Sequence, residues 1–206
     1  MRHGPSRLLH PGDVNTKRSS KMSQKRAMTI TAAATLLFGS LTAVTTMAAD
    51  APSDPQIVGI VLVADDIDIA YGKIALEKSK NKEVREFAQR MITDHGAVQK
   101  SVNELAAKLG VKGADSPTSI SLRKGAVEIT AKLQSLSGNA FDKFYVDNEV
   151  DYHKAVTDVV DGVLIPNAKN AELKAALQGA QPLFLKHLEH ARLIQSGDAG
   201  KMKHGK

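Results

Sequence analysis

The sequence predicts an all-α protein built on a four-helix bundle, with a short extra helix in the connection between the second and third long helices. Three observations carry this prediction. Apolar residues recur at helical spacing over four long segments, and the alternating pattern of strands is absent. Asn, Pro and Gly stand at the ends of these segments, where helices begin and stop.

The first two helices are expected to form a hairpin around Asn81. Asp54 is expected to cap the first helix, which reaches about Ser79, and Asn81 caps the second. Gly110 follows the second helix at the position that favours a left-handed residue. The steps along the second helix alternate strictly between four and three residues, as at a bundle seam. This stripe is Val84, Ala88, Met91, His95, Val98, Val102, Leu105 and Leu109.

The second half of the chain predicts one short and two long helices. A short helix over Leu122–Leu136 is expected to cross one end of the bundle. The third long helix runs from about Phe141 to Leu164, where Pro166 stops it, and Asn170 caps the fourth. The inward positions are Tyr145, Glu149, His153, Val156, Val160 and Val163, then Leu173, Leu177, Ala180, Phe184, His187, Ala191 and Ile194.

The chain divides into a leader (1–48), a linker (49–56), the helical bundle (57–195) and a flexible tail (196–206). Lys25 and Arg26 precede an uncharged apolar run, and small residues stand before Ala49, as in a cleaved secretory signal. The alternative is a membrane anchor, but the run is broken by Gly39 and is short for about 20 spanning residues. We therefore expect a periplasmic or secreted protein with no integral membrane span after cleavage. Met22 is a second candidate start.

The basic charge of the chain belongs to its leader. Of the 28 Lys and Arg residues, seven lie before Asp50, with one of the 22 acidic residues, so the remaining 21 of each sign balance. A neutral domain lacks the positive field that drives binding to phosphates, and nucleic acid is not an expected partner. The sequence has no cysteine, which excludes a thiol nucleophile and disulfide bonds.

Ionisable residues occupy inward positions on all four long helices. His95 and His187 take stripe positions that otherwise hold apolar residues, and Glu149 precedes His153 by one helical turn. Asp68 on the first helix lies 13 residues before Asn81, and His95 lies 14 after it, so an antiparallel hairpin brings them to the same height. The five side chains are thus expected to meet near the middle of the bundle.

Four segments of the chain resemble a known bacterial family. They are Gly72–Ala75, Val84–His95 with its Met-Ile-Thr-Asp-His ending, Phe141–Tyr145 followed by His153, and Leu183–Leu188. The family is catalogued as a domain of unknown function (number 4142) and is often labelled an outer membrane protein. The resemblance covers about Ile57 to Ile194 and implies a ferritin-like four-helix bundle and export, without an established activity. The family commonly has Glu near Gly72, where this chain has Asp68.

Three histidines and two carboxylates on four helices predict a polar or metal site formed by His95, His153, His187, Glu149 and Asp68. Imidazole and carboxylate ligands suit a transition metal: Zn, Cu, Fe or Mn. The Glu-x-x-His pairs of di-iron proteins are missing, which favours a single ion. The alternative is that these histidines are hydrogen-bonded core residues.

Other ionisable residues are expected outside the site. Asp94 is expected to form a cap or a salt bridge, or to support the site indirectly, rather than to be a ligand. His190 is expected to face solvent or a helix flank. Asp65 and Asp66 are expected on the solvated face of the first helix.

The leading hypothesis is an exported binding protein that holds a transition metal in its core and serves in envelope or stress physiology. The first alternative is a mononuclear metal enzyme, which would need an open coordination position and a channel. The second is a structural or interaction protein whose histidines fix the helix register. Protein partners and a homo-oligomer stay open.

Overall fold

The computed structural model describes residues 51–198 of the chain. Within this range every regular element is a helix, so the all-α prediction is confirmed. The expected signal peptide, its cleavage site, the alternative start at Met22 and residues 199–206 of the expected tail lie outside the described residues.

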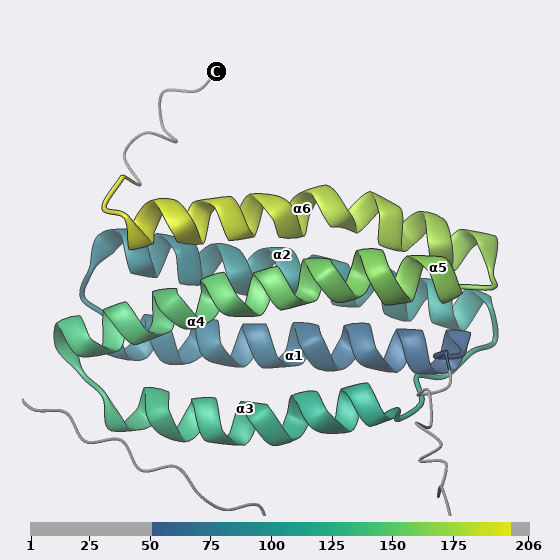
Figure 1. Cartoon of the computed structure of the whole chain (residues 1–206), viewed down its shortest axis with the longest axis horizontal. Helices are drawn as coiled ribbons and strands as arrows, with labels where there is room; N and C mark the ends of the chain where they lie inside the picture. Colours follow the sequence, from purple (N-terminus) through teal and green to yellow (C-terminus); the bar gives the residue numbers. More distant parts are fainter. Residues whose placement is uncertain (1–50, 199–206) are drawn as a thin grey trace, which may run out of the picture. The chain divides into compact units, whose positions relative to one another are not determined.

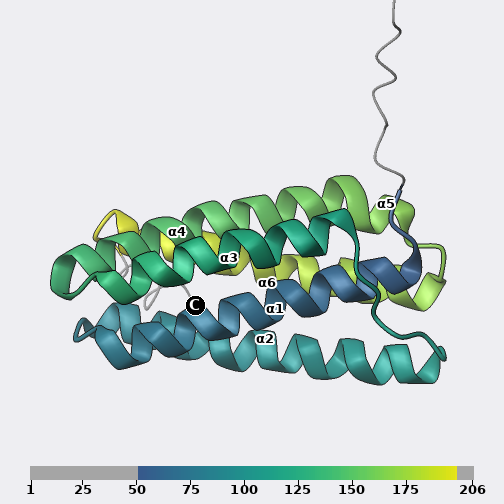
Figure 2. The ribbon, with the colours of Figure 1, turned by 90° about the horizontal axis from the view of Figure 1, so that it is seen from below.

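Helices of different lengths make up the described body. They are α1 (Asp54–Lys78), α2 (Lys82–Lys108), α3 (Pro117–Ser135), α4 (Gly138–Val159), the π-helical segment η1 (Val160–Leu164), the short α5 (Ile165–Asn167) and α6 (Ala171–Gln195). Helices α1, α2, α6 and α4 contact one another in a closed ring, and α3 packs mainly on α1. Figures 1 and 2 show these helices side by side, with α3 along the outside of α1.

The predicted helix ends around Asn81, Gly110 and Asn170 are confirmed. Asn81 accepts hydrogen bonds from the backbone N–H groups of Glu83 and Val84, and Asn170 does the same at the start of α6. Each amide thus satisfies two donors that a helix leaves unpaired at its first turn. Gly110 has a φ of 66°, the left-handed conformation expected after α2.

The prediction that Asp54 is the N-cap of α1 is wrong, because the N-cap is Ser53. The side chain of Gln56 accepts a hydrogen bond from the Ser53 backbone N–H, so the cap moves one residue earlier. The helix therefore begins inside the segment expected as a linker. The Asp54 carboxylate instead accepts hydrogen bonds from the backbone N–H groups of Lys169 and Asn170, at 2.8 and 2.9 Å, and ties the start of α1 to the start of α6.

Helix α3 is longer than the predicted Leu122–Leu136, and it does not cross an end of the bundle. It begins at Pro117, because proline is tolerated in a first turn, where its missing N–H costs nothing. Ser116 and Ser119 form a reciprocal capping box before it. The added length lets α3 run along α1 (Figure 1).

The end of the third long helix differs from the prediction. The helix starts at Gly138 rather than Phe141, and its last turns form a π-helix from Val160 before α5 carries it through Pro166. A π-turn holds an extra residue, so it shifts the phase of the inward face. Val163, predicted inward, is 38% exposed for this reason.

Two apolar clusters form the core, one toward each end of the body. One contains Phe87, Met91 and Phe141, and the other contains Ile57 and Leu173. On α2, α4 and α6 the predicted polar residues lie between the residues of the two clusters, whereas on α1 Asp68 lies between Ile67 and Tyr71 of the first cluster. These residues form a polar layer inside the apolar core.

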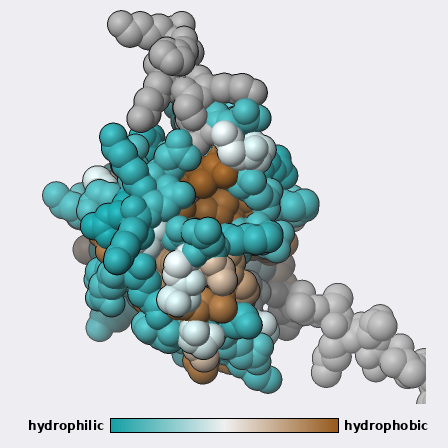
Figure 3. Space-filling view, turned by 90° about the vertical axis from the view of Figure 1, so that its left-hand side faces the viewer, coloured by the Kyte–Doolittle hydropathy of each residue, from teal (hydrophilic) through white to brown (hydrophobic). Residues whose placement is uncertain are grey.

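One end face of the molecule is mainly hydrophilic (Figure 3). Figure 3 shows the end face at which α2 and α4 begin and α6 ends, where hydrophilic side chains surround smaller apolar areas. Across residues 51–198, no helix is both long and apolar enough for a membrane span.

Candidate metal centre

The structure brings the five predicted side chains together in the polar layer. Asp68 comes from α1, His95 from α2, Glu149 and His153 from α4, and His187 from α6. None of the five is more than 2% exposed. The prediction that the hairpin brings Asp68 and His95 to the same height is confirmed, since Asp68 Oδ2 lies 2.8 Å from His95 Nε2.

His95 lies between two carboxylates of α1. Its Nδ1 is hydrogen-bonded to Asp65 Oδ1 at 2.8 Å, so Nδ1 carries a proton and Nε2 is the atom free to act as a ligand. Nε2 forms a close ion pair with Asp68 Oδ2 at 2.8 Å, although the angles of this contact are not those of a regular hydrogen bond.

His153 and His187 are held in the same manner. His153 Nδ1 donates to the backbone carbonyl of Glu149, one turn earlier on α4, at 3.0 Å. His187 Nε2 lies 2.9 Å from Asp94 Oδ2, which can only accept when ionised. The remaining nitrogens, His153 Nε2 and His187 Nδ1, are buried without a hydrogen-bond partner. In each ring, one nitrogen is thus fixed by an oxygen and the other makes no hydrogen bond.

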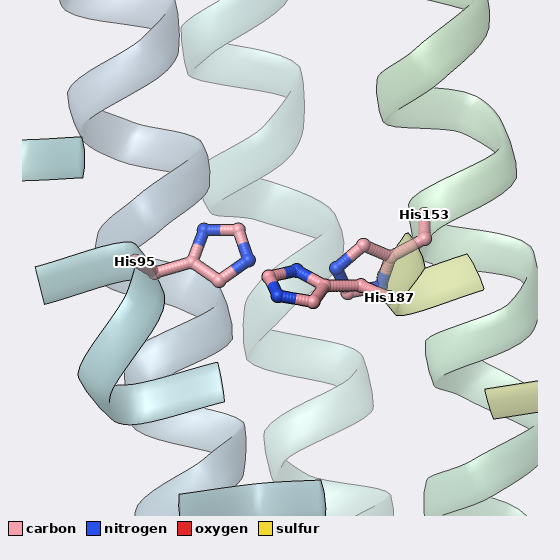
Figure 4. A group of neighbouring side chains, drawn as sticks. All are labelled: His95, His153 and His187. Atoms are coloured by element: carbon pink, nitrogen blue, oxygen red, sulfur yellow. The ribbon is translucent and has the colours of Figure 1, made fainter. Parts of the chain in front are cut away.

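The three rings point toward one another (Figure 4). One nitrogen of each ring lies within 4.8 Å of one nitrogen of the other two. The ring centroids of His95 and His187 are 5.2 Å apart, and those of His153 and His187 are 5.3 Å apart. Three buried imidazoles are therefore concentrated around one point.

Carboxylates complete the cluster. Asp68 Oδ2 lies 3.3 Å from His153 Nε2, and Asp68, Glu149 and His153 form a second group whose ligand atoms lie within 4.8 Å of one another. Both carboxylate oxygens of Asp68 and of Glu149 are buried without a hydrogen-bond partner. The hydroxyl of Tyr145 is also buried without a hydrogen-bond partner. Buried polar atoms normally have partners, so this many unpartnered atoms in one layer calls for an explanation.

Burial and mutual contact set the protonation of these groups in the metal-free protein. Burial raises the pKa of Glu149 well above its usual value, and the nearby Asp68 charge adds to this effect. Burial lowers the pKa of His153, and it lowers that of His187 to about 4. Burial would also lower the pKa of His95, but Asp68 and Asp65 outweigh it and raise the pKa to about 10. A proton on His95 therefore takes the place that a cation would fill.

Asp65 is buried, contrary to the prediction from the sequence. It was expected on the solvated face with Asp66, but it is 2% exposed and holds His95, whereas Asp66 is exposed and accepts a hydrogen bond from Gln99. Helix α1 has no wide solvated face, because α2, α3 and α4 all pack against it. The apolar residues on every side of α1 were the signal that could have revealed this.

Asp94 and His190 are two further ionisable residues near the cluster. The indirect supporting role expected of Asp94 is consistent with its contact to His187 Nε2. His190 is half-buried rather than solvent-facing, with its ring against that of Phe87 at 5.2 Å. It lies outside both groups of candidate ligands.

These features define an all-helical protein with a buried cluster of imidazole and carboxylate groups. The chain belongs to the family described as a domain of unknown function (DUF4142), whose model matches residues 40–194. No curated protein and no solved structure gives a significant match.

Proposed function

We propose that this protein binds a single transition-metal ion in the core of a ferritin-like four-helix bundle made by α1, α2, α4 and α6. The observation that carries the proposal is the convergence of three buried histidines, each with one nitrogen fixed by an oxygen and the other without a hydrogen-bond partner. The proposed ligands are His95, His153, His187 and Asp68, with Glu149 beside them.

The fixed nitrogens support this proposal. Histidines that ligate metals usually donate their second N–H to a carboxylate or a carbonyl, which sets the tautomer and the ring orientation. Asp65, the Glu149 carbonyl and Asp94 supply these acceptors here. Ordinary core histidines have no need for three such supports with the remaining nitrogens facing one another.

The spacing of the free atoms also suits a metal. Ligands held about 2.0–2.1 Å from a tetrahedral ion lie about 3.3–3.4 Å apart. Asp68 Oδ2 lies 2.8 Å from His95 Nε2 and 3.3 Å from His153 Nε2. Small side-chain movements would therefore bring these atoms to ligand distances.

Three imidazoles with carboxylate oxygens suit Zn, Cu, Fe or Mn among the common metals. A cation would also neutralise carboxylates that have no buried Lys or Arg beside them, because none occurs among the buried residues from 51 to 198. The absence of Glu-x-x-His pairs in the sequence favours one ion over a di-iron centre.

We further propose that the protein acts after export, in the periplasm or outside the cell, in envelope or stress physiology. The basic residues, apolar run and small residues before Ala49 support a cleaved signal peptide. In that compartment the neutral helical domain would meet the metal.

Metal analysis tests the proposal. Protein purified after export is incubated with each of the four metals in turn, desalted and assayed for bound metal. We expect about one ion per chain for at least one metal, lost after chelation, because a preformed site of this kind binds one ion. The change His187→Gln should remove most of the bound metal, and Asp66→Asn should not. Retention of none of the four metals would contradict the proposal.

A further inference from the structure

An apolar cavity of about 90 Å³ lies directly beside the proposed metal centre. Its inner wall contains Asp65, His95 and Phe184, all buried, and its outer part contains the exposed residues Thr118 and Ala155. The cavity therefore reaches from the surface near α3 and α4 to a candidate ligand. Among the proposed ligands only His95 lines it.

The walls of the cavity are almost wholly apolar. Side chains such as Ile60 and Val156 make up most of the lining. The hydroxyl of Tyr152, one of the few polar groups in the wall, already donates to the backbone carbonyl of Ala64 at 2.8 Å. Ordered water needs two to four polar partners, which the middle of this cavity does not provide.

An unpartnered polar atom lies at the inner end of the cavity. Asp65 Oδ2 is buried there without a hydrogen-bond partner, next to the His95 ring. That ring stacks on Phe184 with a centroid distance of 5.6 Å and an angle of 15°. The two stacked rings both line the cavity, so an apolar occupant would contact the imidazole of His95 and the ring of Phe184 together.

We propose that this cavity binds a small uncharged molecule, of the size and polarity of dioxygen or nitric oxide, and holds it against the His95 ring, beside the proposed metal centre. An apolar cavity of about 150 Å³ admits benzene, so one of 90 Å³ suits a molecule of about two to four heavy atoms. Charged and strongly polar molecules are excluded, because the walls would leave their polar groups unpaired. The inference rests on the proposed metal site, to which it adds the class of molecule admitted.

Xenon tests the cavity without any metal. Xenon is titrated into the metal-free protein, and binding is followed by NMR shifts of the methyl groups of Ile60 and Val156. We expect saturable shifts in the wild type and at least about tenfold weaker binding after Val156→Phe, which fills the space. Ala155→Phe covers the exposed mouth and provides a second variant should Val156→Phe not fold. Val127→Phe, at a position 69% exposed on α3, is the matched control. Absent shifts, or equal shifts in all variants, would overturn the proposal.

Nitric oxide tests the connection to the metal. It is mixed with protein loaded with iron(II), and the paramagnetic signal of the iron–nitrosyl complex is followed over time. The cavity variants should slow this signal about tenfold or more, while Val127→Phe should leave it unchanged. An equal rate in all variants, with iron retained, would overturn the inference and leave the proposed function standing. Xenon binding without any retained metal would instead overturn the proposed function, and with it the role of the cavity.

Discussion

Asp65 Oδ1 lies 2.8 Å from His95 Nδ1, while Asp68 Oδ2 lies 2.8 Å from Nε2 of the same ring. The two acids are three residues apart on α1 and hold one imidazole between them. In the proposed metal site, Asp65 would support His95 as a ligand and Asp68 would bind the same ion.

The support from Asp65 can be measured by removing its charge. Asp65→Asn should weaken metal binding about 10–100-fold, because such carboxylate partners raise the basicity of a ligating histidine and fix its orientation. Asp66→Asn, the same change at the next and exposed residue, is the control and should alter the dissociation constant less than twofold. Calorimetric titration measures both. Equal affinities in the two variants would show that Asp65 has no such role.

Acid sensitivity of the metal-free protein should depend on His187. Its pKa is lowered from 6.5 to about 4, chiefly by burial, so the unfolded chain binds a proton that the folded protein refuses. The resulting stability is complete above pH 6.5 and is lost as the pH falls toward 4. The loss is on the order of 3 kcal/mol relative to His187→Leu.

The comparison must be made between the two proteins, with chelator present, because Glu149 acts in the opposite direction. Its raised pKa means that the folded protein retains a proton that the unfolded chain releases above pH 4.5. Denaturant unfolding of wild type and His187→Leu at several pH values isolates the histidine. A pH-independent difference between the two would contradict the assigned burial effect.

Gly59 should tolerate no side chain. A Cβ there would lie 2.1 Å from the backbone oxygen of Ala114, whose N–H donates to Pro55 O at 2.8 Å and fixes the loop on α1. Gly59→Ala should therefore cost about 1–3 kcal/mol through displaced backbone. Gly96→Ala on α2 meets no atom within 4 Å and should stabilise by up to about 1 kcal/mol. Thermal unfolding distinguishes them, and equal melting temperatures would refute the close approach.

The proposed export predicts a processed N-terminus. Mature protein from its native host should begin at Ala49 or Asp50 and occur in a periplasmic or culture fraction, because small residues precede this point. Intact-mass measurement gives the N-terminus directly. Retention of residues 22–48 in a membrane fraction would show an anchor instead.

The sequence predicted those parts of the fold that depend on local signals. The heptad steps and the caps at Asn81 and Asn170 predicted where α2 and α6 begin, and the structure confirms both starts. Counting residues from Asn81 predicted that Asp68 and His95 lie at the same height, which the contact between them confirms. Such counting works because an antiparallel hairpin has the same rise per residue on both sides.

Features that depend on a neighbouring helix were missed. Asp65 is buried because several helices surround α1, and the course of α3 along α1 could not be inferred from its own weak pattern. The π-segment at Val160 has no recognised local signal, so the exposure of Val163 was also missed. Distances between the free histidine nitrogens depend on how four helices pack, which spacing along one chain does not specify.

The most direct test compares the melting of wild type, His95→Leu and His187→Leu with and without chelator. A metal that binds only the folded state adds its binding free energy to stability, so chelation should lower the melting temperature of the wild type. Each variant loses a ligand and should melt alike in both conditions, and acidification should erase the wild-type response, because imidazole must be neutral to coordinate. If the histidines are only core residues, leucine avoids burying a polar group, and all three proteins will be indifferent to chelator. That result would contradict the metal site.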